Sequence, residues 1–408
     1  MPKTIRWFGS VAVLGLTLAL VSESAVAQKK YDSGATDAEI KIGNIMPYSG
    51  NASSFGAIGA TEAAYFKKIN EEGGINGRKI TFISYDDGYT PARTVEQAQK
   101  LVKGDEVLFL FNPLGTPGNS AIQKYMNAKK VPQLFVASGA TKWGDPQNFP
   151  WSMGWQPNYQ SEARIYSRYI LEHFPNAKIA MISGTDDAAK DWIKGTRDGL
   201  GARASMIVAT ATFEATDPGI DSQIIALKNS GADLLIGWLT PKTAAQAIKK
   251  VAELNWKPTF FLNNASASIG SVLKPAGLEN AKGIISTSYL KDPTDRTWDD
   301  DVGAKAWRVF MDRYYPNGDK TNANTVYGYS VAQTVVEVLK RCGDDLTREN
   351  VMRQAAGLKL LSLDMLLPGI QISTGPTDFF PIEQMQLMRF DGESWQLFGE
   401  VLTGEVRN

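Results

Sequence analysis

The sequence alternates between short apolar runs and longer amphipathic runs, which restricts the chain to a small set of α/β folds. Glu39 to Met46 (EIKIGNIM) predicts a strand, and a helical pattern follows from about Gly56 to Asn70. Lys79 to Tyr85 predicts the second strand. Val107 to Phe111 (VLFLF) has no polar residue, as in a parallel strand buried on both faces, and a helix is expected near Ala121 to Lys129. These patterns predict a mostly parallel, doubly wound sheet.

The same rhythm begins again in the second half of the chain. Lys178 to Ser183, Ser205 to Thr210 and Asp233 to Trp238 predict strands, with helical patterns between them. The segment between the halves, residues 148–159, is aromatic and contains prolines, which suits a crossover. Because 408 residues are enough for at least two domains, we expect two α/β halves in tandem, each with its own core.

Composition excludes several classes of function. The 43 basic side chains balance the 43 acidic ones, so the positive charge of a general nucleic-acid binder is missing. A single cysteine, Cys342, excludes an intramolecular disulfide and a Cys-rich metal site, and a single histidine, His173, leaves little room for His-based chemistry. The sequence lacks the common nucleotide-binding and hydrolase motifs. We therefore expect a binding protein without catalytic residues, metal or cofactor, whose partner is not a nucleic acid.

The first 27 residues have the pattern of a signal peptide. Lys3 and Arg6 precede an apolar run from Trp7 to Val21, and Ala25-Val26-Ala27 supplies the small residues at a cleavage site. The alternative is an uncleaved anchor helix, although the run is short for a membrane span. No cysteine lies near the cleavage site, which argues against a lipoprotein. We expect cleavage after Ala27 and a periplasmic protein.

Ligands of open α/β sheets bind beyond the carboxyl ends of the strands, and two facing halves would form a cleft there. This rule selects six candidate loops, which are Pro47 to Phe55, Asn112 to Asn119, Ser138 to Thr141, Gly184 to Ala189, Trp238 to Pro241 and Asn263 to Ser268.

One run of residues resembles a known family. Ile69 to Ile80 (INEEGGINGRKI), followed by Asp86-Asp87 and Ala98 to Val102, is similar to the periplasmic leucine/isoleucine/valine-binding protein family. These proteins are the substrate-binding components of branched-chain-amino-acid-type ABC transporters. The similarity continues through the second half, in Asp217 to Leu227 and Gly231 to Trp238.

The resemblance implies the type I periplasmic binding protein fold, which has two doubly wound parallel-sheet lobes joined by a multi-strand hinge. The N-terminal lobe would comprise residues 28–156 and 288–364, and the C-terminal lobe residues 157–287 and 365–408. A ligand would bridge the lobes and stabilise a closed form. The implied partners are a small carboxylate-bearing ligand and an inner-membrane ABC permease, and the protein is expected to be a monomer.

In the family, two loops hold the ligand carboxylate with backbone amides and hydroxyls. The matching positions are Gly115 and Thr116, beside Leu114, and Gly139 and Thr141, beside Ser138. Glycine allows a close approach of backbone N–H groups to an anion, and a helix N-terminus assists. The alternative is that these are ordinary turn glycines with capping hydroxyls.

Two departures from the family pattern concern the ligand. Amino-acid binders usually have an acidic residue for the ligand ammonium where this chain has Asn264, and an amide cannot supply that charge. The tyrosine of the usual Asp-Tyr-Gly loop is replaced in Asp187-Ala188-Ala189. The carboxylate end therefore matches the family and the ammonium end does not, although Asp186 or Asp187 could still serve an ammonium.

These departures favour a hydrophobic or aromatic carboxylate. Three aromatic residues in or beside the cleft loops, Tyr48, Phe55 and Trp238, are candidates to stack on such a ligand. Three alternatives remain open, namely a branched-chain or other amino acid, an amide, and a ligand sensor on the same fold. An exported enzyme is disfavoured by the missing acid, base and nucleophile motifs.

Overall fold

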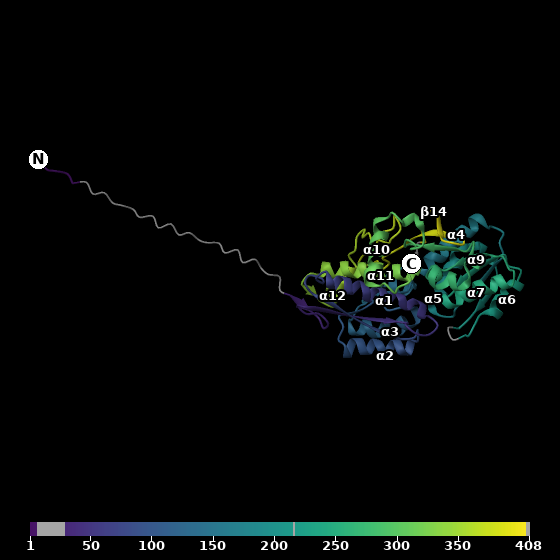
Figure 1. Cartoon of the computed structure of the whole chain (residues 1–408). Coiled ribbons are helices and arrows are strands. Elements are labelled where there is room, and N and C mark those ends of the chain that lie inside the picture. The colour runs from purple at the N-terminus through teal and green to yellow at the C-terminus, as the bar shows by residue number, and fades with distance from the viewer. Residues whose placement is uncertain (6–28, 215–216, 405–408) are drawn as a thin grey trace.

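The computed structural model describes residues 1–5, 29–214 and 217–404. The apolar run of the predicted signal peptide and its cleavage site after Ala27 lie outside the described residues. In the part of the chain that is described, the strands form a five-stranded sheet, a seven-stranded sheet and a small two-stranded pair. Figure 1 shows two bodies side by side, one with α1, α2, α3, α11 and α12 and the other with α4, α5, α6, α7 and α9.

The first sheet has the order β3-β2-β4-β5-β6, and its neighbouring strands run parallel. Its strands are β2 (Glu39–Met46), β3 (Lys79–Asp86), β4 (Phe109–Phe111), β5 (Gln133–Val136) and β6 (Ser152–Gly154). The helices of this half are α1 (Gly56–Glu71), α2 (Pro91–Gln99), α3 (Thr116–Lys129), α10 (Val302–Tyr314), α11 (Ala323–Cys342) and α12 (Arg348–Ala355).

The second sheet has the order β14-β13-β11-β10-β9-β7-β8. Its parallel strands are β7 (Ile179–Ser183), β8 (Ile207–Thr212), β9 (Leu234–Trp238), β10 (Thr259–Leu262) and β11 (Ile285–Ser288). The hairpin of β13 (Gln384–Phe390) and β14 (Trp395–Thr403) continues the sheet antiparallel from β11. The helices are α4 (Tyr159–His173), α5 (Asp187–Leu200), α6 (Asp221–Asn229), α7 (Pro241–Glu253), α8 (Lys274–Ala276) and α9 (Leu278–Ala281).

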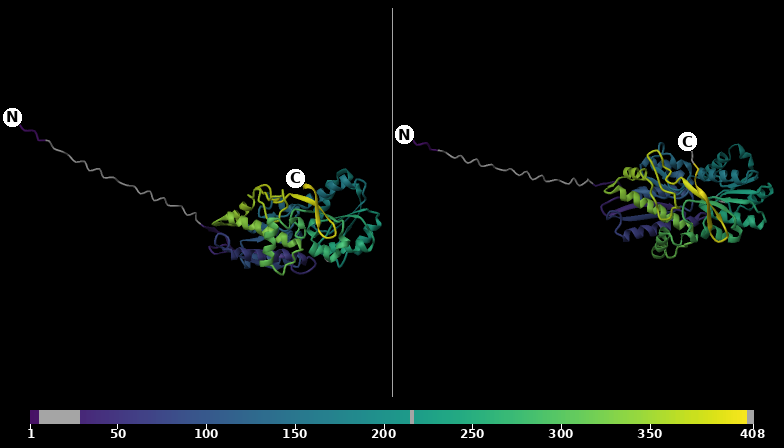
Figure 2. Two further views of the ribbon diagram at one scale, coloured as in Figure 1. Left: turned by 45° about the horizontal axis from the view of Figure 1, so that its top comes forward. Right: turned by 90° about the horizontal axis from the view of Figure 1, so that it is seen from above.

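The expectation of an α/β fold with two mostly parallel sheets in tandem is confirmed. Between its described elements, the chain passes from one half to the other after β6, after β11 and after α12. Figure 2 shows the C-terminal hairpin, in yellow, near the junction of the two halves. The largest buried apolar cluster contains Ile40 and Ile42 of the first sheet as well as Ile179 and Phe261 of the second. The two halves therefore share a continuous core at the junction.

Four expected elements differ from the structure. Strand β4 begins at Phe109, two residues later than the apolar run of Val107 to Phe111. Helix α3 begins at Thr116 and not near Ala121, because Pro117 fits the first helical turn, where no N–H partner is needed. Strand β6 lies inside the segment 148–159, which was expected only to cross between the halves. Strand β8 begins at Ile207, two residues later than expected, and its alternating burial marks an edge strand.

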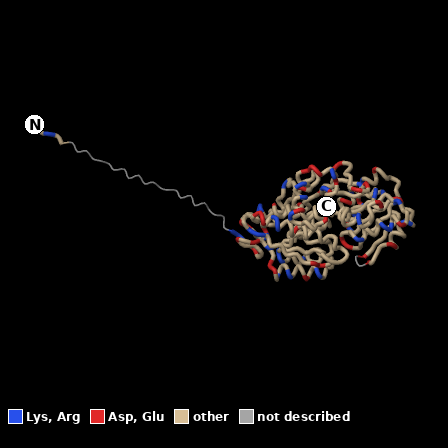
Figure 3. The backbone as a smooth tube through the Cα atoms, viewed as in Figure 1, with Lys and Arg blue, Asp and Glu red and all other residues tan. Residues whose placement is uncertain are grey.

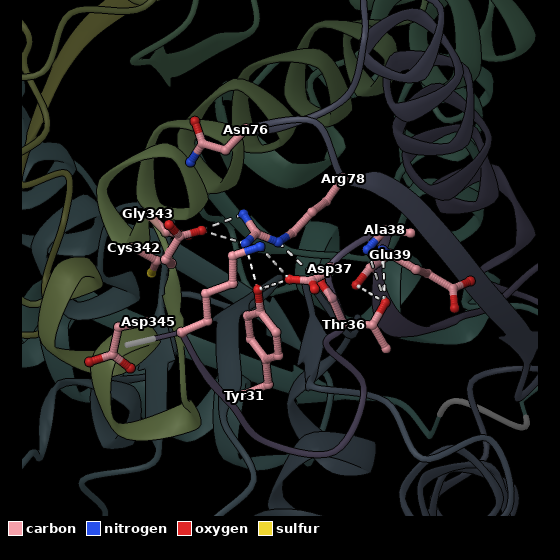
Figure 4. Close-up of polar contacts among 12 residues, drawn as sticks. Tyr31, Thr36, Asp37, Ala38, Glu39, Asn76, Arg78, Cys342, Gly343 and Asp345 are labelled. Atoms are coloured by element: carbon pink, nitrogen blue, oxygen red, sulfur yellow. Dashed lines mark hydrogen bonds and ion pairs between the residues drawn. The ribbon is translucent and has the colours of Figure 1, made fainter. Parts of the chain in front are cut away.

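The family-like run around Arg78 has a structural role. Asn76 and Gly77 adopt positive φ angles of 49° and 80° and make a tight turn. Arg78, only 2% exposed, donates hydrogen bonds to the carbonyl of Thr36 (3.1 Å) and the hydroxyl of Tyr31 (2.7 Å). It also forms a 2.5 Å ion pair with Asp344. Figure 4 shows this cluster, which joins β1 (Lys30–Tyr31) and β12 (Asp345–Leu346) to the turn before β3.

Charged residues of both signs are interspersed along the chain as it is drawn in Figure 3. This distribution agrees with the balanced composition. Among the residues that the structure describes, no helix combines the length and the apolar character needed to cross a lipid bilayer.

Candidate functional site

A cavity of about 360 Å³ lies between the two halves of the molecule. Most of its lining comes from the chain that directly follows strands of both sheets. These strands are β3, β4, β5, β6, β7, β8, β9, β10 and β11. Parallel strands place their carboxyl ends at one edge of a sheet, so residues distant in sequence meet there. Helices α1 and α11 contribute further residues, among them Ile58, Asn324 and Tyr327.

Six of the eleven predicted site residues line the cavity, namely Phe55, Leu114, Gly115, Thr116, Trp238 and Asn264. The other five lie outside its lining, namely Tyr48, Ser138, Gly139, Thr141 and Asp187. Ligand contact stays a prediction for both groups. The contacts that residues of the second group make within the protein are described next.

Tyr48 packs against the start of α1. Its hydroxyl lies 2.6 Å from the hydroxyl of Ser84, and its backbone N–H donates to the Asp86 carboxylate at 2.9 Å. A Cβ added at Gly59 would come within 2.3 Å of the Tyr48 hydroxyl oxygen, so the glycine makes room for this ring. The tyrosine thereby links β3 to α1.

The loop of Ser138 to Thr141 is engaged in internal bonds. The Ser138 hydroxyl accepts a hydrogen bond from the indole of Trp143 at 2.8 Å and lies 2.6 Å from the hydroxyl of Thr116. Gly139 packs under Tyr159, since an added Cβ would lie 2.7 Å from that ring. The second loop of the predicted carboxylate site therefore supports the first loop and a wall of the cavity.

Asp187 and its neighbour Asp186 point to different surroundings. The Asp187 carboxylate is partly exposed and pairs with Lys142 (3.4 Å) and Lys190 (3.1 Å), which lower its pKa. Asp186 caps α5, with its side chain accepting from the N–H of Ala189 at 2.9 Å, and it lines the cavity. Burial raises the pKa of Asp186. Of these two acids, only Asp186 belongs to the lining of the cavity.

Aromatic side chains form much of the cavity wall. The rings of Tyr159 and Trp238 lie with centroids 4.3 Å apart. The aromatic lining residues are Phe55, Tyr89, Tyr159, Phe213, Trp238, Tyr289 and Tyr327. Sequence analysis missed Tyr89, which lies three residues after the end of β3, although the rule of strand carboxyl ends could have selected it. Tyr327 comes from α11, and no local pattern marks it.

The cavity also carries acids that the sequence analysis did not place there. Glu214 and Asp292 join Asp186 in the lining, and burial raises the pKa of Asp292 to about 6. Lys291 is the basic side chain of the lining among the described residues, but its ammonium lies 2.7 Å from the carboxylate of Asp301. The charge of Lys291 is therefore already balanced within the protein.

Asn264 occupies the loop where the family pattern has an acid, but a carboxyl group is nearby. The backbone N–H of Asn264 donates to Glu162 on α4 at 2.6 Å, and its side-chain amide donates to the carbonyl of Thr287. Glu162 is 3% exposed and also accepts from the hydroxyl of Tyr166 at 2.9 Å. Burial raises the pKa of Glu162 to about 7. This carboxyl positions the Asn264 loop and is not itself part of the cavity lining.

Comparisons with known proteins agree with this architecture. Residues 39–394 match the model of a family described as "Periplasmic binding protein". A curated relative, the Leu/Ile/Val-binding protein homolog 1 of Brucella abortus (strain 2308), is 23% identical over 337 residues, which cover 81% of this chain and 86% of that protein.

Two solved structures share the fold at low sequence identity. A branched-chain amino acid ABC transporter protein from Thermus thermophilus with bound valine has a TM-score of 0.80 at 16% identity, over 90% of this chain and 96% of that one. A solute-binding protein from R. palustris in complex with benzoate has a TM-score of 0.75 at 18% identity, over 88% and 96%. The family match extends over most of the sequence and includes the cavity lining and every strand of the two large sheets except β14. The chain therefore belongs to the periplasmic binding protein family, whose members bind ligands and are not enzymes.

Proposed function

We propose that the protein is the solute-binding component of an ABC importer and that it binds a hydrophobic or aromatic monocarboxylate between its two halves. The observation that carries the proposal is the lining of the cavity, which combines aromatic walls with the start of α3 at Gly115 and Thr116. An aromatic or aliphatic body would pack against the rings, and a carboxylate would face the helix start.

The start of α3 suits an anion for two reasons. The first backbone N–H groups of a helix have no intrahelical acceptor, and the helix dipole favours negative charge there. Gly115 caps the helix with φ of 96°, a conformation that favours glycine, and the Thr116 side chain adds a hydroxyl. The benzoate complex on the same fold supports this type of ligand.

An amino acid is the second candidate, and the acids of the cavity favour it. Asp186, Glu214 and Asp292 could each face a ligand ammonium, so the charge missing at Asn264 has possible substitutes. The related structure with bound valine supports this candidate. Because no unpaired cation lines the described part of the cavity, neither candidate includes a dicarboxylate.

Calorimetric titration of the purified chain tests the two candidates. The panel contains benzoate, hexanoate, benzamide, phenylalanine, leucine and valine. We expect micromolar binding of the monocarboxylates, weaker binding of the amino acids, and little binding of benzamide because it lacks the charge. An α-ammonium buried without a counter-charge costs several kcal/mol, enough to remove most of a micromolar affinity. Micromolar binding of leucine without a response to benzoate would contradict the proposal in favour of the second candidate.

The division into moving parts belongs to the same proposal. Residues 28–156 and 288–364 form the N-terminal lobe, residues 157–287 and 365–408 form the C-terminal lobe, and the lobes close around the ligand. We expect a monomer whose radius of gyration falls when ligand saturates it, as measured by small-angle scattering. An unchanged radius despite calorimetric binding would contradict lobe closure.

The remaining parts of the proposal concern location and partner. The signal peptide would be removed after Ala27, and the periplasmic protein would deliver its ligand to an inner-membrane ABC permease. N-terminal sequencing of periplasmic extract should find a chain that begins at Gln28. Delivery to a receptor in place of a permease would identify the sensor alternative, and affinity capture with solubilised membranes distinguishes the two.

A further inference from the structure

We propose that Tyr89 sets the length of ligand that the cavity accepts, because its ring is an end wall held in place by the protein backbone. This inference rests on the proposed function, since it concerns the same cavity. Three features of Tyr89 support it: its backbone conformation, the contact of its ring with a glycine, and the second cavity that it also lines.

The backbone of Tyr89 adopts a conformation that is unfavourable for an aromatic residue. Its φ angle is 60°, in the left-handed region that bulky side chains rarely occupy. The Asp87 carboxylate accepts hydrogen bonds from the backbone N–H of Tyr89 at 2.8 Å and from the hydroxyl of Thr94 at 2.6 Å. Asp87 is itself 1% exposed. A buried acid thus fixes a strained turn, and strain of this kind is typical of functional sites.

The ring of Tyr89 lies directly against Gly115 at the start of α3. A Cβ added at Gly115 would come within 2.5 Å of the ring carbon Cε2, so position 115 has no room for a side chain. The φ angle of Gly115, 96°, would also disfavour any other residue. The ring is therefore confined on one side by the turn after β3 and on the other by the residues proposed to face the ligand carboxylate.

A second, smaller cavity of about 20 Å³ also has Tyr89 in its lining. Phe213 and Thr240 from the second half likewise belong to the linings of both cavities, so the two cavities share these three residues. Asn51 and Lys242 line the smaller cavity, and the Lys242 ammonium donates a 3.0 Å hydrogen bond to the Asn51 side chain between the halves. Loss of the Tyr89 ring would join the two cavities and lengthen the space available to a ligand.

The test compares two ligands with the same head group and different lengths, benzoate and 4-phenylbutyrate. Binding of each is measured by calorimetry for the wild type, Tyr89→Phe and Tyr89→Ala. We expect Tyr89→Ala to change the ratio of the two dissociation constants at least tenfold in favour of 4-phenylbutyrate. Tyr89→Phe, which keeps the ring, should leave the ratio within threefold of wild type. An unchanged ratio in Tyr89→Ala would overturn the proposal.

A matched control separates selectivity from backbone strain. Lys130 also has a positive φ angle, 52°, but it ends α3 at a point outside the cavity lining. Lys130→Gly should leave the ratio of dissociation constants unchanged. If Tyr89→Ala does not fold, Tyr89→Leu replaces it. Leucine removes the ring and keeps an apolar side chain, so it should change the ratio in the same assay.

The same binding measurements distinguish failure of the proposed function from failure of this inference. If the wild type binds neither benzoate nor 4-phenylbutyrate, the monocarboxylate proposal is wrong. The length ratio is then measured with phenylglycine and homophenylalanine, which carry an ammonium as well. A ratio that changes in Tyr89→Ala supports the inference that Tyr89 limits ligand length, whichever head group is bound. Absence of binding in both series would overturn both proposals.

Discussion

The backbone N–H of Thr141 donates a hydrogen bond to the carboxylate of Asp191, with 2.7 Å between nitrogen and oxygen. Thr141 follows the β5 strand of the first half, and Asp191 lies on α5 of the second. The other oxygen of Asp191 accepts from the side chain of Gln160 at 2.8 Å, which holds the carboxylate in place. This bond joins the halves beside the cavity and should form only when they are close together.

Asp191→Ala should therefore weaken ligand binding by destabilising the closed form. A hydrogen bond to a half-buried charged group contributes about 1–2 kcal/mol, or about tenfold in affinity. Calorimetry measures the affinity, and thermal unfolding without ligand should change little. Asp198→Ala, which removes pairs that lie within the second half, is the matched control. Equal affinities of Asp191→Ala and wild type would show that the bond does not contribute to closure.

Asp292 should make binding of an anionic ligand depend on pH. Burial raises the pKa of Asp292 to about 6, so its negative charge is lost as the pH falls from 7 to 5. Because a carboxylate ligand is repelled by the ionised form, its affinity should rise over that range, by about tenfold for charges a few ångströms apart. An amino acid whose ammonium faces Asp292 should show the opposite trend. Calorimetry at several pH values measures both.

Asp292→Asn should remove most of this dependence and bind the carboxylate tightly at pH 7. Asp299→Asn, at an exposed residue paired with Arg308, is the control and should keep the wild-type profile. A wild-type affinity that is constant between pH 5 and 7 would mean that Asp292 does not face the ligand charge.

Arg78→Ala should lower stability without changing ligand affinity. The buried guanidinium has hydrogen bonds to Thr36 and Tyr31 and an ion pair with Asp344, and none of these residues lines the cavity. Leaving those partners unpaired should cost about 2–4 kcal/mol, measured by urea unfolding. Arg78→Lys should restore little of the lost stability, because one ammonium cannot replace the planar set of donors of a guanidinium.

The control for Arg78 is Arg313→Ala. Arg313 is exposed and pairs with Glu71 at 3.5 Å, so its loss should cost less than about 0.5 kcal/mol. Equal stability of the two variants would contradict the structural role of the Arg78 cluster. A large loss of affinity in a folded Arg78→Ala protein would contradict its separation from the ligand.

Glu162 should make the protein less stable as the pH rises from about 4.5 to about 7. These values are its ordinary pKa and the pKa raised by burial in the folded protein. Over this range the unfolded chain releases the proton first, so the folded state binds more protons and the free energy of unfolding falls. The loss should reach about 3 kcal/mol near pH 7.

Glu162→Gln should remove this part of the pH dependence and keep an acceptor for the backbone N–H of Asn264. Urea unfolding at pH 4.5, 6 and 7.5 measures the effect. Glu172→Gln, at an exposed residue on the same helix that pairs with Arg168, serves as the control. A wild-type profile in Glu162→Gln would show that another group causes the pH dependence.

The sequence by itself determined the fold class and the family of this protein. Apolar runs such as Val107 to Phe111 and the glycine-rich turn before Arg78 depend on local spacing and local backbone preference, and these are visible in the sequence. Strand carboxyl ends also follow from local pattern. This is why Leu114, Gly115, Thr116, Trp238 and Asn264 could be selected and do line the cavity.

Only the tertiary structure decided which side chains face the cavity and what charge it carries. Gly139 lies under Tyr159, the Ser138 hydroxyl accepts from Trp143, and the charge of Lys291 is balanced by Asp301. Tyr327 and Asp292 enter the lining from segments far along the chain. A side chain's partners depend on residues that folding brings near it. Local sequence spacing does not predict which residues these are. The loop of Asn112 to Asn119 could therefore be selected from the sequence, but the start of α3 inside it could not. The acidic, aromatic lining of the cavity depends on how the two halves pack together.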